Sequence, residues 1–232
     1  MAPQNRRIAR SFLLEIASEL DASRTVVRVN PVPTSDFALD LAAIVETRLT
    51  TCMLAKAESS IQLAAAAPLE VIALCETPLE IVHAASIAAA DSCAGMMWGS
   101  EDLALELGLA RSRTIGRLSP ILESARHTVL FAAKASGKVA IDAAFPDLDD
   151  DINLRSETIA AVEAGFDSKA CVHPSQLGVV RAAFLPDGAD VTWPTDVIAE
   201  GSLRQDAGFR FRGSMVDADV IRRAHSVLSR AN

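Results

Sequence analysis

The sequence predicts an α/β fold in which helices pack on a parallel sheet, and three observations support this prediction. Short apolar runs of strand length alternate with helical patterns along most of the 232 residues. Each predicted strand is a continuous apolar run, as expected for parallel strands that are covered on both faces. Half of the residues are apolar and only 4% are aromatic. The chain can therefore bury a large core in which small helical side chains pack against a sheet.

We expect a helix at the amino end and then six strands, each followed by a helix. The first helix, at 5–20, places five apolar side chains on one face. The expected strands are 25–30, 50–55, 70–75, 93–99, 138–145 and 169–173. The helices that follow them are expected at 36–47, 59–67, 78–90, 101–107, 154–164 and 174–184, with a further long helix at 120–136 and a last one at 218–230.

Proline and glycine mark several boundaries of these elements. Pro78 and Pro120 suit the first turn of a helix, and Gly137 suits the position just after a helix. The segments 109–119 and 186–213 show little periodicity, so we expect them to be irregular.

The number of strands leaves two architectures open. A closed (β/α)₈ barrel needs eight strands, so six strands describe either an open sheet or a barrel without its first strands. We assign residues 1–186 to a barrel-type domain of six βα units and residues 187–232 to a C-terminal loop and helix.

Charge and cysteine content exclude several classes of partner. The formal net charge is −8 without a basic stripe, so we expect no nucleic-acid partner. No apolar run approaches the roughly 18 residues that span a membrane, and we expect no membrane partner. None of the four cysteines forms a C-x-x-C pair, which predicts reduced thiols in a cytoplasmic protein.

Charged side chains gather at the predicted carboxyl ends of the strands, where parallel α/β folds place their active sites. These residues are Arg28, Lys56, Glu58, Glu76, Asp102, Asp142 and His173. The set contains both signs of charge, which recognition of an anionic substrate and a metal ion would require.

Glu76 and Asp102 follow consecutive strands, so we expect them to be neighbours in space. One or two carboxylates, completed by water and substrate oxygens, form the usual Mg²⁺ site. The alternative is that one acid caps a helix and the other is a surface charge.

For four further candidates, a structural interpretation competes with a functional one. Arg28 either clamps a substrate oxygen or forms a structural ion pair. For Lys56 we favour a solvated or salt-bridged side chain, and for His173 a hydrogen bond to the backbone at a helix start. Asp217 directly precedes the last helix, so it is a candidate N-cap.

Seven stretches, in this order, resemble the citrate lyase β-subunit-like family of the HpcH/HpaI aldolase superfamily, which includes malyl-CoA and citramalyl-CoA lyases. They are V-R-V-N (27–30), M-L-A-K-A-E-S (53–59), A-L-C-E-T-P (73–78), G-M-M-W-G-S-E-D-L (95–103), A-I-D-A-A-F-P-D-L-D-D (140–150), G-F-D-S-K-A-C-V-H-P-S-Q (165–176) and G-S-M-V-D-A (213–218). Each stretch alone is weakly specific, but together they cover nearly the whole chain.

The resemblance implies a TIM (β/α)₈-type barrel, commonly a homotrimer, that uses Mg²⁺ to make or break a carbon–carbon bond next to a coenzyme A thioester. By this resemblance Glu76 and Asp102 hold the metal, and Arg28 and Glu76 bind the substrate, which is a small CoA thioester or keto acid. Arg28 also acts in catalysis by contacting acyl or keto-acid oxygens. Asp217 matches an acid–base residue on the C-terminal segment.

The chain also departs from the family pattern. The family barrel begins with a strand, a helix and a second strand that precede the match, so we expect the first β-α-β unit, roughly 40–50 residues, to be missing. Ala55 stands where proline is usual. Glu80 stands where glycine is frequent, and we expect this bulky acid to alter the substrate pocket.

Three functions remain open at this point. The first is a Mg²⁺-dependent oxo-acid lyase or thioester hydrolase that acts on a short β-hydroxyacyl-CoA such as malyl-CoA or citramalyl-CoA. The second is an inactive or fragmentary homologue, and the third is an aldolase that acts on a free hydroxy-keto acid.

Overall fold

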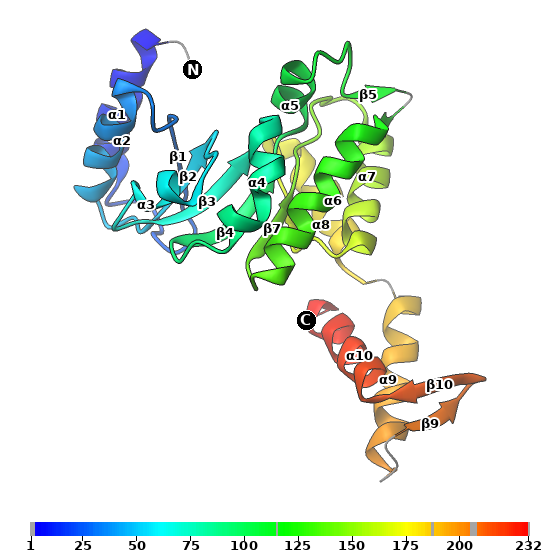
Figure 1. Ribbon diagram of the computed structural model, residues 1–232. Helices are drawn as coiled ribbons and strands as arrows, with labels where there is room; N and C mark the ends of the chain where they lie inside the picture. Colours follow the sequence, from blue (N-terminus) through cyan, green and yellow to red (C-terminus); the bar gives the residue numbers. More distant parts are fainter. Residues whose placement is uncertain (1–2, 115, 187, 205–207, 232) are drawn as a thin grey trace. The chain divides into compact units, whose positions relative to one another are not determined.

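The computed structural model describes residues 3–114, 116–186, 188–204 and 208–231 of the chain (Figure 1). The chain forms two compact units. The first comprises Met1–Pro146 and Glu163–Val172, and the second comprises Asp147–Val162 and His173–Asn232. None of the described helices combines the length and the apolar character needed to span a bilayer.

A six-stranded parallel sheet forms the centre of the first unit. Its strands lie in the order β1-β2-β3-β4-β7-β8, and all neighbouring pairs are parallel. They are β1 (Val27–Val29), β2 (Thr51–Ala55), β3 (Glu70–Cys75), β4 (Cys93–Trp98), β7 (Val139–Asp142) and β8 (Ser168–Lys169). This arrangement confirms the predicted α/β fold with six parallel strands.

Helices connect the strands and pack back on the sheet. They are α2 (Ser35–Val45), α3 (Ser60–Ala64), α4 (Pro78–Ala88), α5 (Ser100–Glu106) and α6 (Pro120–Ala135). A further helix, α1 (Pro3–Ile16), precedes β1 and packs against α2. α2 packs against β1, α4 against β3 and β4, and α6 against β4 and β7, while α4 and α6 lie side by side (Figure 1). Large buried side chains on strands and helices alike form the core; they include Leu54, Ile87, Met96, Trp98 and Leu122.

Two segments of the first unit differ from the sequence prediction. The segment 109–119 contains a short antiparallel hairpin, β5 (Arg113–Thr114) and β6 (Arg117–Leu118). The strand expected at 169–173 is only Ser168–Lys169. The amide of Ala170 donates to the carbonyl of Asp142 at 3.0 Å, and the chain leaves the sheet after this contact.

The second unit contains most of α7 and the C-terminal elements. These are α7 (Asp151–Ala164), the 3₁₀ helix η1 (Pro174–Gln176), α8 (Leu177–Phe184), α9 (Gly188–Ser202), β9 (Gly208–Phe211), β10 (Ser214–Asp217) and α10 (Ala218–Ala231). The expectation of an irregular segment at 186–213 is wrong for α9, which tolerates Pro194 inside the helix. α9 packs against α10 around Val197, Val216 and Ala224. This packing stabilises a helix whose own sequence is a poor helix former.

Candidate functional site

A cavity of about 660 Å³ lies in the first unit and contains four of the charged residues predicted at the strand ends. Arg28 lies in β1, Lys56 follows β2, Glu76 follows β3, and Asp102 lies in the first turn of α5 after β4. The wall on the side of α1 adds apolar and basic side chains. The structure therefore confirms that Glu76 and Asp102 are neighbours and places two cations beside them.

Glu76 is a buried carboxylate of this cavity, with only 3% of its side chain exposed. Arg28 Nη2 donates to Glu76 Oε1 at 3.2 Å and to Oε2 at 3.4 Å. Burial raises the pKa of Glu76; Arg28 opposes this effect, and the nearby charge of Asp102 adds to it. A buried acid beside a second acid favours an additional positive charge, which a metal ion would supply.

The donor set fits a hard divalent cation. In the ranges that the structure describes, no group of three or more His, Cys, Asp or Glu side chains is placed to hold a metal. Two carboxylates at an open cavity match the habit of Mg²⁺, which takes one or two acids and completes its octahedron with water and substrate oxygens. They do not match zinc, which takes His and Cys ligands in closed sets.

Gly99 determines how closely the strand ends approach each other behind this carboxylate. Its amide donates to the carbonyl of Cys75 at 2.8 Å. A Cβ at position 99 would lie 3.0 Å from Glu76 Cβ and 3.3 Å from Glu76 Oε2. The glycine therefore leaves the space that the Glu76 side chain occupies, a role that sequence reasoning missed.

If Glu76 holds the metal, we expect Gly99→Ala to weaken Mg²⁺ affinity by about tenfold or more, because changes in the groups that position a metal ligand typically cost about 10–100-fold in affinity. The backbone at Gly99 has φ −116°, which alanine adopts without strain, so the effect comes from Glu76. Calorimetric titration with MgCl₂ measures it. Gly178→Ala is the matched control, since a Cβ there meets no atom within 4 Å. Equal affinity in both variants would show that Glu76 is not a ligand.

Glu80 is fully buried and caps α4 rather than altering the cavity, so the expectation of a changed substrate pocket is wrong. Its Oε2 accepts from the amides of Glu76 and Thr77 at 2.7 and 2.8 Å, while Thr77 Oγ1 accepts from the amide of Glu80. This reciprocal capping box fixes the turn that carries Glu76. Burial raises the pKa of Glu80 to about 7, although both amide donors oppose this shift.

The raised pKa of Glu80 predicts a stability that falls as the pH rises. The folded state holds the proton up to about pH 7, whereas the unfolded chain releases it near 4.5, so ionisation costs stability across this window. Glu80→Gln keeps an acceptor for the two amides and removes the ionisation. Between pH 5 and pH 8 we expect the wild type to lose about 2 kcal/mol relative to Glu80→Gln. Urea unfolding in EDTA measures this difference, and parallel pH profiles would contradict it.

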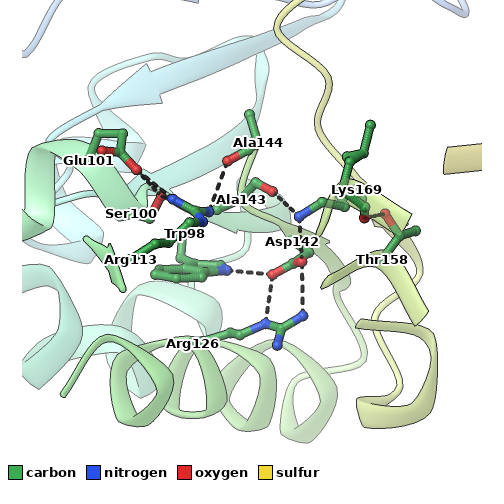
Figure 2. Close-up of polar contacts among 11 residues, drawn as sticks. Trp98, Ser100, Glu101, Arg113, Arg126, Asp142, Ala143, Ala144, Thr158 and Lys169 are labelled. Carbon is green, nitrogen blue, oxygen red and sulfur yellow. Dashed lines mark hydrogen bonds and ion pairs between the residues drawn. The ribbon is translucent and has the colours of Figure 1, made fainter. Parts of the chain in front are cut away.

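Asp142 was expected among the strand-end candidates, but it is fully buried and does not line the cavity. It accepts from Trp98 Nε1 at 2.8 Å, from Arg126 Nε and Nη2 at 2.8 and 2.9 Å, and from Lys169 Nζ at 2.9 Å (Figure 2). Burial alone would raise the pKa of Asp142, but Lys169 and Arg126 lower it. Through these hydrogen bonds the carboxylate links Trp98, at the end of β4, to α6 and β8.

A second polar cluster holds the turn that carries Asp102. Glu101 Oε1 accepts from Ser100 and from Arg113 Nη1, the latter at 2.6 Å (Figure 2). It also accepts from Ser112 Oγ at 2.7 Å. Arg113 also donates to the carbonyl of Ala144 at 3.3 Å. The G-S-E-D sequence contains no pattern that identifies the arginine partner, because it lies on the β5–β6 hairpin.

Three predicted residues remain. Glu58, in the first unit, does not line the cavity, and it accepts from Thr77 Oγ1 at 3.4 Å. His173 and Asp217 lie in the second unit. His173 Nδ1 accepts from the amide of Ser175 at 3.2 Å, which confirms the preferred interpretation as a backbone contact at a helix start. Asp217 is exposed, and its Oδ1 accepts from the amides of Asp219 and Val220 at 3.0 Å each, so it is the N-cap of α10. A catalytic role for Asp217 stays a prediction.

The chain is similar in sequence and in structure to several known proteins. The sequence profile described as HpcH/HpaI aldolase/citrate lyase matches residues 1–174. A citrate lyase subunit beta-like protein of Mycobacterium tuberculosis is 43% identical over 100% of this chain and 84% of its own length. A (3S)-malyl-CoA thioesterase of Cereibacter sphaeroides is 32% identical over 88% of this chain and 71% of its own. The crystal structure of CitE from M. tuberculosis with magnesium, acetoacetate and coenzyme A is similar at a TM-score of 0.93 and 43% identity, over 100% of this chain and 86% of that one.

Proposed function

Because this chain belongs to the HpcH/HpaI aldolase/citrate lyase family, we propose that it is a Mg²⁺-dependent carbon–carbon lyase acting on a short β-hydroxyacyl-CoA thioester such as malyl-CoA or citramalyl-CoA. The observation that carries this proposal is the single cavity shared by Glu76, Asp102, Arg28 and Lys56 at the carboxyl ends of adjacent strands. Two acids suit the metal, and two cations suit an anionic substrate. The similar chain bound to magnesium, acetoacetate and coenzyme A supports this assignment.

The cleavage reaction assigns a role to each proposed residue. The β-hydroxyl loses its proton, the adjacent carbon–carbon bond breaks, and a carbonyl product separates from a thioester enolate. Mg²⁺ held by Glu76 and Asp102 would supply Lewis-acid polarisation of the oxygen that becomes this carbonyl. The Arg28 side chain is 57% exposed at the cavity, so its guanidinium can also pair with an anionic substrate oxygen.

We propose Asp217 as the acid–base group, because a carboxylate is a competent base for a hydroxyl and its side chain is exposed at the end of β10. We also propose that the protein is a cytoplasmic homotrimer. The family resemblance supports this assembly, and the four free cysteines suit a reducing compartment. Light scattering coupled to gel filtration measures the assembly state.

Thioester hydrolysis is the second candidate, and the 32% identity to a (3S)-malyl-CoA thioesterase favours it. Product analysis separates the two reactions, because a lyase converts malyl-CoA to acetyl-CoA and glyoxylate whereas a hydrolase releases free malate and free CoA. We expect acetyl-CoA and glyoxylate in the presence of Mg²⁺ and no product in EDTA. Turnover that is unaffected by EDTA would overturn the proposal, and equal turnover of the free acid would indicate an aldolase that does not require CoA.

A further inference from the structure

Arg28, which the proposed function places at the substrate, lies on the edge strand of the sheet. Among the strands that the structure describes, β1 pairs only with β2, and the ladder covers only the three residues Val27–Val29. An edge strand has hydrogen-bonding partners on one side only. The chain leaves the ladder at Asn30, two residues after Arg28. The position of Arg28 therefore depends on the contacts that hold the chain just after β1.

Asp40 on α2 provides these contacts. Its Oδ2 accepts from the backbone amide of Asn30 at 3.0 Å and from Asn30 Nδ2 at 2.6 Å. Its Oδ1 accepts from Arg10 Nη1 on α1 at 2.8 Å. Asp40 is only 9% exposed, and it lines the same cavity as Arg28. Hydrogen bonds to a carboxylate are about twice as strong as those between neutral groups, so Asp40 fixes the end of β1 against α2.

Asp36, one turn earlier on α2, forms ion pairs of a different kind. It accepts from Arg6 Nη1 at 2.6 Å and from Arg10 Nη1 at 3.0 Å. The two aspartates therefore share Arg10, but of the two only Asp40 also bonds to Asn30. The contacts of Asp36 join α1 to α2, whereas the contact of Asp40 with Asn30 joins α2 to β1.

Other contacts hold the two proposed metal ligands. Glu80 accepts from the amide of Glu76, and Glu101 and Arg113 hold the turn that carries Asp102. Neither network includes Asp40 or Asn30. A change at Asp40 is therefore expected to displace Arg28 and to leave both acids in place.

We propose that Asp40 is a positioning residue, which fixes the end of β1 through Asn30 so that the guanidinium of Arg28 lies beside Glu76 and meets an anionic oxygen of the substrate. This inference rests on the proposed function of the same cavity. Asp40 acts only through Asn30 and β1 in this role. The Arg28 side chain is 57% exposed, so few packing contacts hold it in place once its strand end is released.

Steady-state kinetics in saturating Mg²⁺ test the role in catalysis. In Asp40→Ala we expect kcat/KM for malyl-CoA to fall about tenfold or more, because misplacing a group by about 1 Å costs up to about 100-fold. Calorimetry is expected to show no fall in Mg²⁺ affinity, whereas a general loss of structure would weaken both. Asp40→Asn keeps an acceptor oxygen for Asn30, so it is expected to lose less than Asp40→Ala, and it replaces that variant if alanine prevents folding.

Asp36→Ala is the matched control, because it makes the same change on the same helix and also removes a partner of Arg10. We expect kcat/KM to stay within about twofold of the wild type, as for the loss of a partly exposed ion pair. Equal losses in Asp36→Ala and Asp40→Ala would show that the joint between α1 and α2 matters rather than the contact with Asn30, which would overturn the inference.

A double-mutant cycle tests whether Asp40 acts through Arg28. In an Arg28→Ala background we expect Asp40→Ala to cause no further loss of kcat/KM, because two residues that act through one group are not additive. A purely structural role would give losses that multiply, and this result would contradict the proposal.

Amide hydrogen exchange of residues 27–30 tests the positioning step without substrate. We expect faster exchange in Asp40→Ala than in the wild type and unchanged exchange in Asp36→Ala. Unchanged exchange in Asp40→Ala would overturn the inference while the proposed function stands. If the wild type shows no Mg²⁺-dependent turnover, the proposed function fails, and the exchange rates alone decide whether Asp40 holds the strand of Arg28.

Discussion

Replacing Asp102 with asparagine is expected to lower Mg²⁺-dependent turnover of malyl-CoA or citramalyl-CoA by on the order of 10³-fold, because a metal ion used as Lewis acid supplies several kcal/mol of transition-state stabilisation. Asp102 is exposed at the cavity, so the change removes one negative charge without disturbing the core. We expect folding stability to change by no more than about 0.5 kcal/mol. Metal affinity falls together with turnover, because asparagine offers a neutral oxygen in place of an anionic one.

The control for this prediction is Asp91→Asn, the same chemical change at an exposed aspartate just before β4. It lies at the opposite end of that strand from Asp102, so full activity is expected. Mg²⁺ titration and a coupled assay for acetyl-CoA release measure both variants. Unchanged Mg²⁺-dependent turnover in Asp102→Asn would show that other residues hold the metal.

The sequence was sufficient to predict that four charged side chains meet at the cavity. Parallel strands present their carboxyl ends at one edge, so the order of Arg28, Lys56, Glu76 and Asp102 along the chain determines their proximity once six parallel strands are recognised. The direction of each side chain was not predictable in this way. Asp142 also ends a strand, yet it points into the protein because buried donors on α6 and β8 surround it.

The sequence contains a capping box that the prediction missed. T-P-L-E at 77–80 follows the capping-box pattern, in which a glutamate three residues after the N-cap accepts from the backbone. We instead expected Glu80 to alter the substrate pocket, because glycine is frequent at this position in the family pattern. The α9 helix was missed for a different reason, since Pro194 argues against a helix locally and only its packing with α10 favours one.

Asp142→Asn is expected to destabilise the protein by about 3–5 kcal/mol, which is the usual cost of removing one partner of a buried ion pair. The side chain is fully buried and accepts from three residues. Asparagine keeps the shape but removes the negative charge that both Arg126 and Lys169 contact. Its amide nitrogen is also a hydrogen-bond donor, so it cannot accept from the donors that surround it. For a chain of this size the loss corresponds to a fall in melting temperature of roughly 10–15 °C.

Asp167→Asn is the matched control, because it makes the same change in an ion pair at the surface. Lys134 Nζ lies 2.5 Å from Asp167 Oδ1, and both side chains are 43% exposed. Asparagine can still accept from the amide of Ala140 through the oxygen that replaces Asp167 Oδ2, so we expect a loss below about 1 kcal/mol. Thermal and urea unfolding compare the two variants. Equal losses would mean that the network around Asp142 is no more important than a surface pair, and that packing alone holds the end of β4 in place.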